Sequence, residues 1–167
     1  MDQIKSIRTA IWHQFGASLD MLENAINMCP DEHWDTELNF WYTAYHCIFW
    51  TDYYLTTEPN KFIPPAPFTF SEFDPNEKKP DSTYSRTELI FYLEHCRKKA
   101  IQLISTLTNE KMNDRWINDY KNYSLFEILL YNLRHIQHHA AQLNLLLRQT
   151  VDQAPNWVSQ AKKIEHI

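Results

Sequence analysis

Glycine is almost absent from this sequence, because the 167 residues contain a single one, Gly16. Phosphate-binding loops and dinucleotide-binding fingerprints need several glycines, since their backbone must approach a phosphate closely. Tight β-hairpin turns also favour glycine. The shortage therefore argues against nucleotide-binding α/β folds and against folds of many short strands, and it favours a helical protein.

Cysteines are few and widely spaced. Their number is odd, and no CxxC motif joins Cys29, Cys47 or Cys96. Disulfide frameworks and thiolate zinc sites need paired or clustered cysteines. We therefore expect buried, reduced thiols, as in a cytoplasmic protein.

Positive charge is also in short supply, with a formal net charge of −5. A surface that binds nucleic acid would need an excess of Lys and Arg on one face, so no nucleic-acid partner is expected. No run approaches the ~18 apolar residues of a membrane-spanning helix, so no membrane partner is expected either. The first residues, Met1–Lys5, lack the apolar core of a secretion signal, which again predicts a cytoplasmic location.

Four segments carry helical patterns. Apolar residues recur every three or four positions from about residue 2 to 28, and Pro30 follows this stretch. Residues 39–57 are apolar and aromatic almost all round, which predicts a mostly buried helix. Two capping-box motifs, Ser85-Arg-Thr-Glu88 and Ser124-Leu-Phe-Glu127, then open helices to about residues 108 and 150. After Pro155 the sequence also allows a short last helical turn over residues 157–162.

Residues 58–84 form a link unlike the rest of the chain. The link holds six of the eight prolines, at positions 59, 64, 65, 67, 75 and 80. Proline removes helical hydrogen bonds, so no helix should cross it. Its phenylalanines indicate that part of it packs on the body of the protein.

These segments predict an all-α fold, a four-helix bundle within one domain that covers residues 1–167. The links at residues 30–38 and 109–123 are short, whereas the Pro-rich link could run the length of the bundle. The second and third helices would then be parallel, which gives an up-down-down-up topology.

The last helix carries two histidines at metal-ligand spacing. His135 and His139 are four residues apart and therefore differ by only about 40° around the helix, on its inward side. His138 lies about 100° from His139 and should lean outward. Two imidazoles at this spacing can bind one cation, although they also suit histidines bonded at the edge of a core. His46, within the buried aromatic helix, is the plausible third ligand.

Two stretches around these histidines resemble motifs of a known family. They are residues 132–143, NLRHIQHHAAQL, and residues 45–54, YHCIFWTDYY. The first resembles the HxxHH–GQ helix of the DinB/YfiT-like superfamily, and the second resembles the second-helix histidine motif of that family. The resemblance covers the whole chain. The sequence departs from the family pattern at Ala140-Ala141, where many members have Arg-Gly. A substrate or partner contact made by that arginine in other members is therefore not expected here.

The resemblance implies an up-down-down-up bundle with a divalent metal held by His46, His135 and His139. Imidazole ligands suit zinc and nickel. Gln142, one turn past His139, is a candidate to orient a ligand or bound water, and Tyr42 and Trp50 are candidate pocket residues. Characterised members of the family include thiol-dependent transferases, and many members are dimers.

Three functions remain open from the residues. The first is an enzyme that transfers a low-molecular-weight thiol to a small-molecule electrophile at the metal. The second is a metal-dependent hydrolase of a small amide or ester. The third is a non-catalytic metal-binding stress-response dimer.

Surplus apolar residues on the last helix, at Leu130, Tyr131 and Leu145, predict a partner surface and hence a homodimer.

Overall fold

The computed structural model describes residues 3–76 and 78–164, and its core consists of four long helices. They are α1 (Gln3–Met28), α3 (Phe40–Tyr54), α4 (Arg86–Ser105) and α5 (Leu125–Val151). The described part also contains one short helix, three 3-10 turns and two short strands: α2 (Asp31–Trp34), η1 (Pro59–Lys61), η2 (Ser71–Phe73), η3 (Lys111–Asn113), β1 (Arg115–Ile117) and β2 (Asn122–Ser124). The all-α prediction is confirmed.

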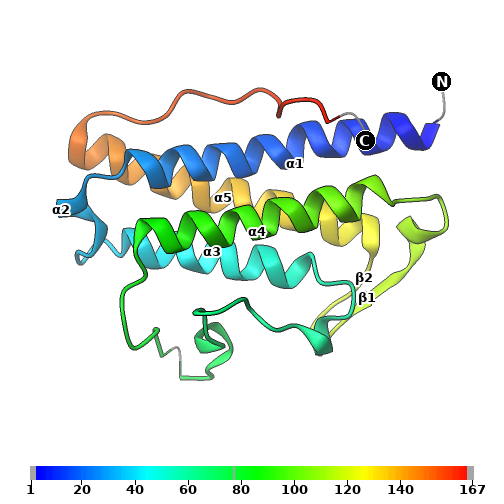
Figure 1. Ribbon diagram of the computed structural model, residues 1–167, viewed down its shortest axis with the longest axis horizontal. Helices are drawn as coiled ribbons and strands as arrows, with labels where there is room; N and C mark the ends of the chain where they lie inside the picture. Colours follow the sequence, from blue (N-terminus) through cyan, green and yellow to red (C-terminus); the bar gives the residue numbers. More distant parts are fainter. Residues whose placement is uncertain (1–2, 77, 165–167) are drawn as a thin grey trace.

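The four long helices pack in a square. Helix α5 contacts α1 and α3, and α4 contacts the same two helices, so α1 and α3 lie diagonally across the core. The colour order in Figure 1 shows α1 and α5 running in one direction and α3 and α4 in the opposite one. The Pro-rich residues 58–84 cross the molecule beneath α3 and α4 in this view, as a connection between parallel helices must.

Local hydrogen bonds fix the helix boundaries. At the start of α4, Ser85 Oγ accepts from the Glu88 backbone N–H, and Glu88 accepts from the Ser85 backbone N–H at 2.7 Å. Ser124 provides the serine half of the same motif at α5. Helices α3 and α4 each end about three residues earlier than predicted, and just beyond their ends Thr56 and Thr106 donate their hydroxyls to carbonyls of the last turn.

Two links contain structure that the sequence did not predict. The link after α1 holds α2, and the link before α5 holds an antiparallel hairpin in which Trp116 pairs with Tyr123. The turn of this hairpin has no glycine. Instead, Asn118 Oδ1 accepts from the backbone N–H groups of Tyr120 and Lys121, so the side chain of Asn118 stabilises a turn of the kind that often contains glycine.

Residues 152–164, after α5, form an extended strap along α1 (Figure 1), so the short turn considered for residues 157–162 is wrong. The strap bonds to α1 rather than to itself: Ala161 N–H donates to the His13 carbonyl at 2.9 Å, and Trp12 donates to the Lys162 carbonyl. Gly16 lies under the strap. A Cβ atom at this position would be 2.6 Å from the Cβ of Ala161, which explains the single glycine.

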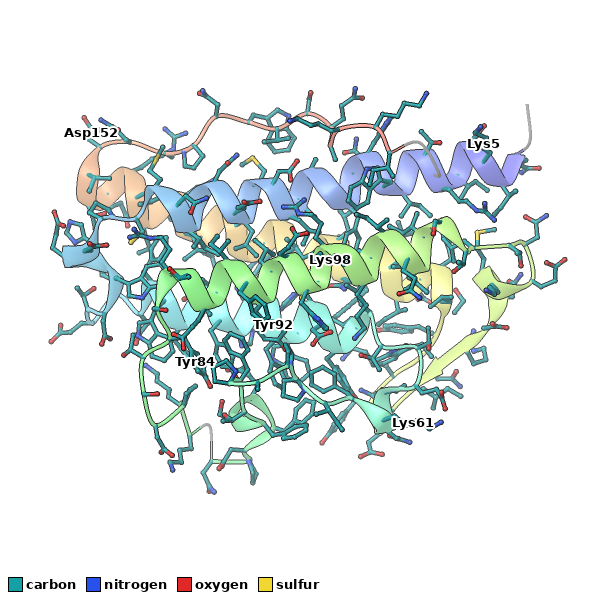
Figure 2. All side chains as sticks on the ribbon, in the orientation of Figure 1. Lys5, Lys61, Tyr84, Tyr92, Lys98 and Asp152 are labelled. Carbon is teal, nitrogen blue, oxygen red and sulfur yellow. The ribbon has the colours of Figure 1, made fainter. Side chains whose placement is uncertain are left out.

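An aromatic layer joins the crossover to the bundle. Phe62 and Phe68 are each 6% exposed, and Phe68 stacks on Tyr92 with ring centroids 4.2 Å apart. Figure 2 shows side chains filling the space between the helices and the crossover, near the labelled Tyr84 and Tyr92. Burial of these rings stabilises the crossover against α3, the helix that carries His46.

In the described part of the chain, no helix combines the length and the hydropathy that crossing a bilayer requires.

Candidate metal centre

Three histidines from two helices meet in the bundle. His46 lies on α3, and His135 and His139 lie one turn apart on α5, which packs against α3. One ring nitrogen of each lies within 4.8 Å of one ring nitrogen of the other two. The ring centroids are 5.7 Å apart for His46 and His135, 4.8 Å for His46 and His139, and 4.6 Å for His135 and His139.

His138 is the neighbour that stays outside this cluster. It is exposed, whereas the three clustered histidines are half-buried. Its ring lies 5.0 Å from that of His139, so sequence proximity alone does not separate the two residues. Their different angles around the helix do separate them, as the 100° rotation per residue predicts.

Hydrogen bonds fix the tautomers of two of the histidines. His46 Nδ1 lies 2.6 Å from a Glu72 carboxylate oxygen, and His139 Nδ1 lies 2.7 Å from Gln142 Oε1. Both partners are acceptors, so each Nδ1 carries the proton and donates it. In the neutral form of each ring, Nε2 then carries the lone pair, which is available to a cation.

Glu72 is the site residue that the sequence did not reveal. It lies in η2, within the Pro-rich crossover, and its side chain is only 4% exposed. The carboxylate oxygen that accepts from His46 also accepts from Trp50 Nε1 at 2.9 Å, and the Tyr42 side chain is one of the groups that lower the pKa of this carboxyl. Tyr42 and Trp50, which the sequence suggested as pocket residues, thus both act on the group that orients His46.

The environment keeps the α5 histidines neutral. Burial, together with the neighbouring imidazoles, lowers the pKa of His135 from 6.5 to about 3. Burial and the charge of His46 lower the pKa of His139 to about 4, although its bond to Gln142 opposes this shift. Burial would raise the pKa of Glu72, but the hydrogen bond and charge of His46 outweigh it, so that the pKa falls below its usual value. At neutral pH His135 and His139 are therefore unprotonated, and they lie near the ionised carboxylate of Glu72.

The donor set fits a divalent cation. His135 Nδ1 is buried and has no hydrogen-bond partner, which is costly for a ring nitrogen unless it meets another group. Three imidazoles converge, and a carboxylate and an amide hold the outer nitrogens of two of them, His46 and His139, which is the usual arrangement of a histidine metal site. Zinc sites with three protein ligands keep a coordination position open, as catalytic sites require.

Asp52, six residues after His46 on α3, lies outside this cluster. Its carboxylate is buried and accepts from Tyr92 at 3.1 Å and from Lys99 at 2.6 Å, both on α4. The pair spans α3 and α4 on the side away from α5. Asp52 therefore contributes to helix packing, and the sequence motif that contains it supplies no acid or base to the histidines.

Ala140 and Ala141 follow the last ligand candidate. Ala140 is fully buried in the core, and Ala141 is exposed. An arginine at residue 140 would have to enter the core of this chain.

The comparisons with known proteins agree with the geometry. The family model of the DinB superfamily matches residues 14–143. This range includes all three clustered histidines and covers more than half of the chain, so the chain belongs to the DinB superfamily. Comparisons with curated proteins and with solved structures gave no significant match.

Proposed function

We propose that this DinB superfamily protein binds one divalent metal ion through His46, His135 and His139, and that it transfers a low-molecular-weight thiol to small-molecule electrophiles there. The observation that carries the proposal is the convergence of three imidazole nitrogens within 4.8 Å. Zinc and nickel are the expected ions, since imidazole suits both.

The chain's own residues prepare the ligands. Glu72 and Gln142 hold the Nδ1 protons of His46 and His139, and this fixes the ring orientations before any ion arrives. Burial keeps His135 unprotonated, so no proton has to leave it at neutral pH. A bound divalent ion with an open position acts as a Lewis acid that stabilises a thiolate or hydroxide at neutral pH.

Thiol transfer balances without a redox partner. The thiol loses its proton to solvent, the sulfur attacks the electrophilic carbon, and the leaving group departs with the bonding electrons. Trp50, whose ring lies 6.3 Å from that of His46, provides an apolar wall beside the ligands.

The test is an activity screen on the metal-loaded protein. Electrophiles such as 1-chloro-2,4-dinitrobenzene are offered with and without glutathione, cysteine or other cellular thiols, and product is followed by absorbance. The proposal predicts a thiol-dependent rate that is lost in His139→Ala and kept in His138→Ala. Thiol-independent hydrolysis of a test ester or amide would point to a hydrolase instead. Stoichiometric metal binding with neither activity would support a non-catalytic metal-binding protein.

A second copy of this chain is the macromolecular partner that we propose. Leu130 and Leu145 on α5 are 43% and 54% exposed, and Tyr131 lies half-buried beside Leu130. Apolar side chains on one helix surface favour self-association. Light scattering should give about twice the 20.1 kDa monomer mass, and Leu145→Glu should shift it to the monomer. A monomer mass for the unmodified chain at micromolar concentration would contradict the proposal.

A further inference from the structure

A cavity of about 580 Å³ lies beside the metal centre. Residues of α3, of the crossover and of the hairpin turn line it. Its volume is within the ~300–1,000 Å³ range of small-molecule sites. Trp50 and Glu72 line the cavity and both contact His46, while Tyr54 lines it and lies 5.8 Å from His135, measured between ring centroids. The cavity and the histidine cluster therefore share walls.

Seven of the fourteen residues that line the cavity are aromatic. The six that belong to α3 and the crossover are Trp50, Tyr53, Tyr54, Phe62, Phe70 and Phe73. The rings of Trp50, Tyr53 and Phe73 lie 5.2–5.5 Å apart, with interplanar angles of 85°, 76° and 65°. These three rings therefore pack edge to face against one another, and Phe73, which is 41% exposed, presents part of its ring to the cavity.

Negative charge outweighs positive charge around the cavity. Three carboxylates line it, from Glu72, Asp74 and Asp119, against the single ammonium group of Lys121. The Glu72 side chain is 4% exposed, and its Oε1 is buried without a hydrogen-bond partner. Among the residues that the structure describes, Asp119 forms no ion pair. An anionic ligand would be repelled here, whereas a cation would be attracted.

An ammonium group of the chain itself already lies against these rings. Lys121 Nζ is 5.8 Å from the centroid of Tyr54 and 5.2 Å from that of Tyr131. Cations within about 6 Å of an aromatic face are attracted by its quadrupole, and cages of aromatic residues with carboxylates recognise ammonium groups in this way.

From this combination of aromatic rings and surplus carboxylates we infer that the cavity binds the ammonium group of a small amine-bearing ligand. That this ligand is the substrate of the metal centre rests on the proposed function. Binding of the ammonium group itself needs only the cavity, so it is measurable without turnover.

Isothermal titration calorimetry with choline tests the inference on the full-length protein. Its matched control is 3,3-dimethylbutan-1-ol, in which carbon replaces the charged nitrogen, and benzoate serves as an aromatic anion. We expect choline to bind with one site per chain and about 10-fold more tightly than the alcohol. Equal affinity for the two, tighter binding of benzoate, or no choline binding at 10 mM would overturn the inference.

Substitutions locate the binding in the cavity. Phe73→Leu keeps an apolar side chain but removes the ring. It should weaken choline binding about 5-fold and leave the affinity for the alcohol almost unchanged. Asp119→Asn should weaken choline binding by a few fold at low salt and less at high salt. Phe91→Leu is the matched control, because Phe91 is 60% exposed on α4 and lies outside the cavity. An equal effect of Phe91→Leu and Phe73→Leu would refute the assignment.

The same titration in His139→Ala separates the two proposals. Choline binding that persists without the metal supports the cavity on its own. If choline binds but no thiol is transferred, the proposed function fails alone. If thiol transfer occurs and choline does not bind, the cavity inference fails alone.

Discussion

Glu72 orients His46, and we expect removal of its charge to lower the zinc affinity that we propose for the three histidines. The contact is short, 2.6 Å, and the carboxylate is 96% shielded from solvent, since its side chain is 4% exposed. Charge-assisted hydrogen bonds of this kind are about twice as strong as neutral ones. Loss of a group that orients a metal ligand typically costs 10- to 100-fold in affinity, about 1.4–2.8 kcal/mol.

Two substitutions separate the contribution of the charge of Glu72 from that of its hydrogen-bond acceptors. Glu72→Gln keeps a carbonyl acceptor for His46 but removes the charge, so zinc affinity should fall about 10-fold. Glu72→Ala also removes the acceptor of Trp50, and the loss should approach 100-fold. Competition with a fluorescent zinc chelator at pH 7.5 measures both values.

Glu58→Gln is the matched control, because Glu58 lies in the same crossover but pairs with Lys61 at the surface, with its side chain 65% exposed. Such surface pairs contribute about 0–1 kcal/mol, so zinc affinity should stay unchanged. Wild-type affinity in Glu72→Gln, together with lost binding in His46→Ala, would refute the role of the carboxylate. The histidine would then be held by packing alone.

Three further predictions concern the histidines and the strap. His139→Ala should abolish stoichiometric zinc binding by elemental analysis, whereas His138→Ala should retain it, and the reverse result would reject the ligand assignment. In the metal-free protein, His135 stays neutral down to a pKa of about 3 while its unfolded form takes a proton near 6.5. The unfolded state therefore binds more protons in this window, and stability in urea titrations should fall by about 1 kcal/mol per pH unit from pH 6.5 downward, less so in His135→Ala. Gly16→Ala should force the Cβ atom against Ala161 and destabilise the fold by about 1–2 kcal/mol, net of the helical gain, and Ala161→Gly should restore stability.

Helical periodicity explains why much of the fold and the histidine pair were predictable. Rotation of about 100° per residue is a local property, so the angles of His135, His138 and His139 follow from their numbers alone. The burial of His46 followed from the apolar residues around it. That α3 would place this ring against α5 required the order of the helices, which the resemblance to a family supplied and the packing now shows.

The links could not be predicted in the same way. No period runs through residues 58–84, so nothing in the sequence placed Glu72 opposite His46. The available signal was an acidic residue between two aromatic ones, Phe70-Ser-Glu-Phe73. The hairpin before α5 was missed for a related reason, because its turn depends on the side chain of Asn118 rather than on glycine.

Ion pairs between helices could not be predicted from the sequence for a different reason. Asp52 and Lys99 are 47 residues apart, and each is a single charge on a helix of its own. A buried carboxylate within an aromatic helix suggests chemistry, yet here Lys99 and Tyr92 satisfy it. Only the facing helix distinguishes a structural ion pair from a catalytic acid.

The crossover links the stability of the fold to the preparation of the site. Its buried rings, such as Phe62, pack on α3, and the same segment carries Glu72 to His46 and Trp50. The ligands themselves stand on α3 and α5, which are rigid, regularly hydrogen-bonded elements. The group that sets the tautomer of His46 instead stands on η2, a single 3-10 turn of the crossover that aromatic contacts hold against α3. Loss of those contacts would therefore affect the orientation of His46 before it affected the helices, because the histidine's own backbone does not depend on the crossover.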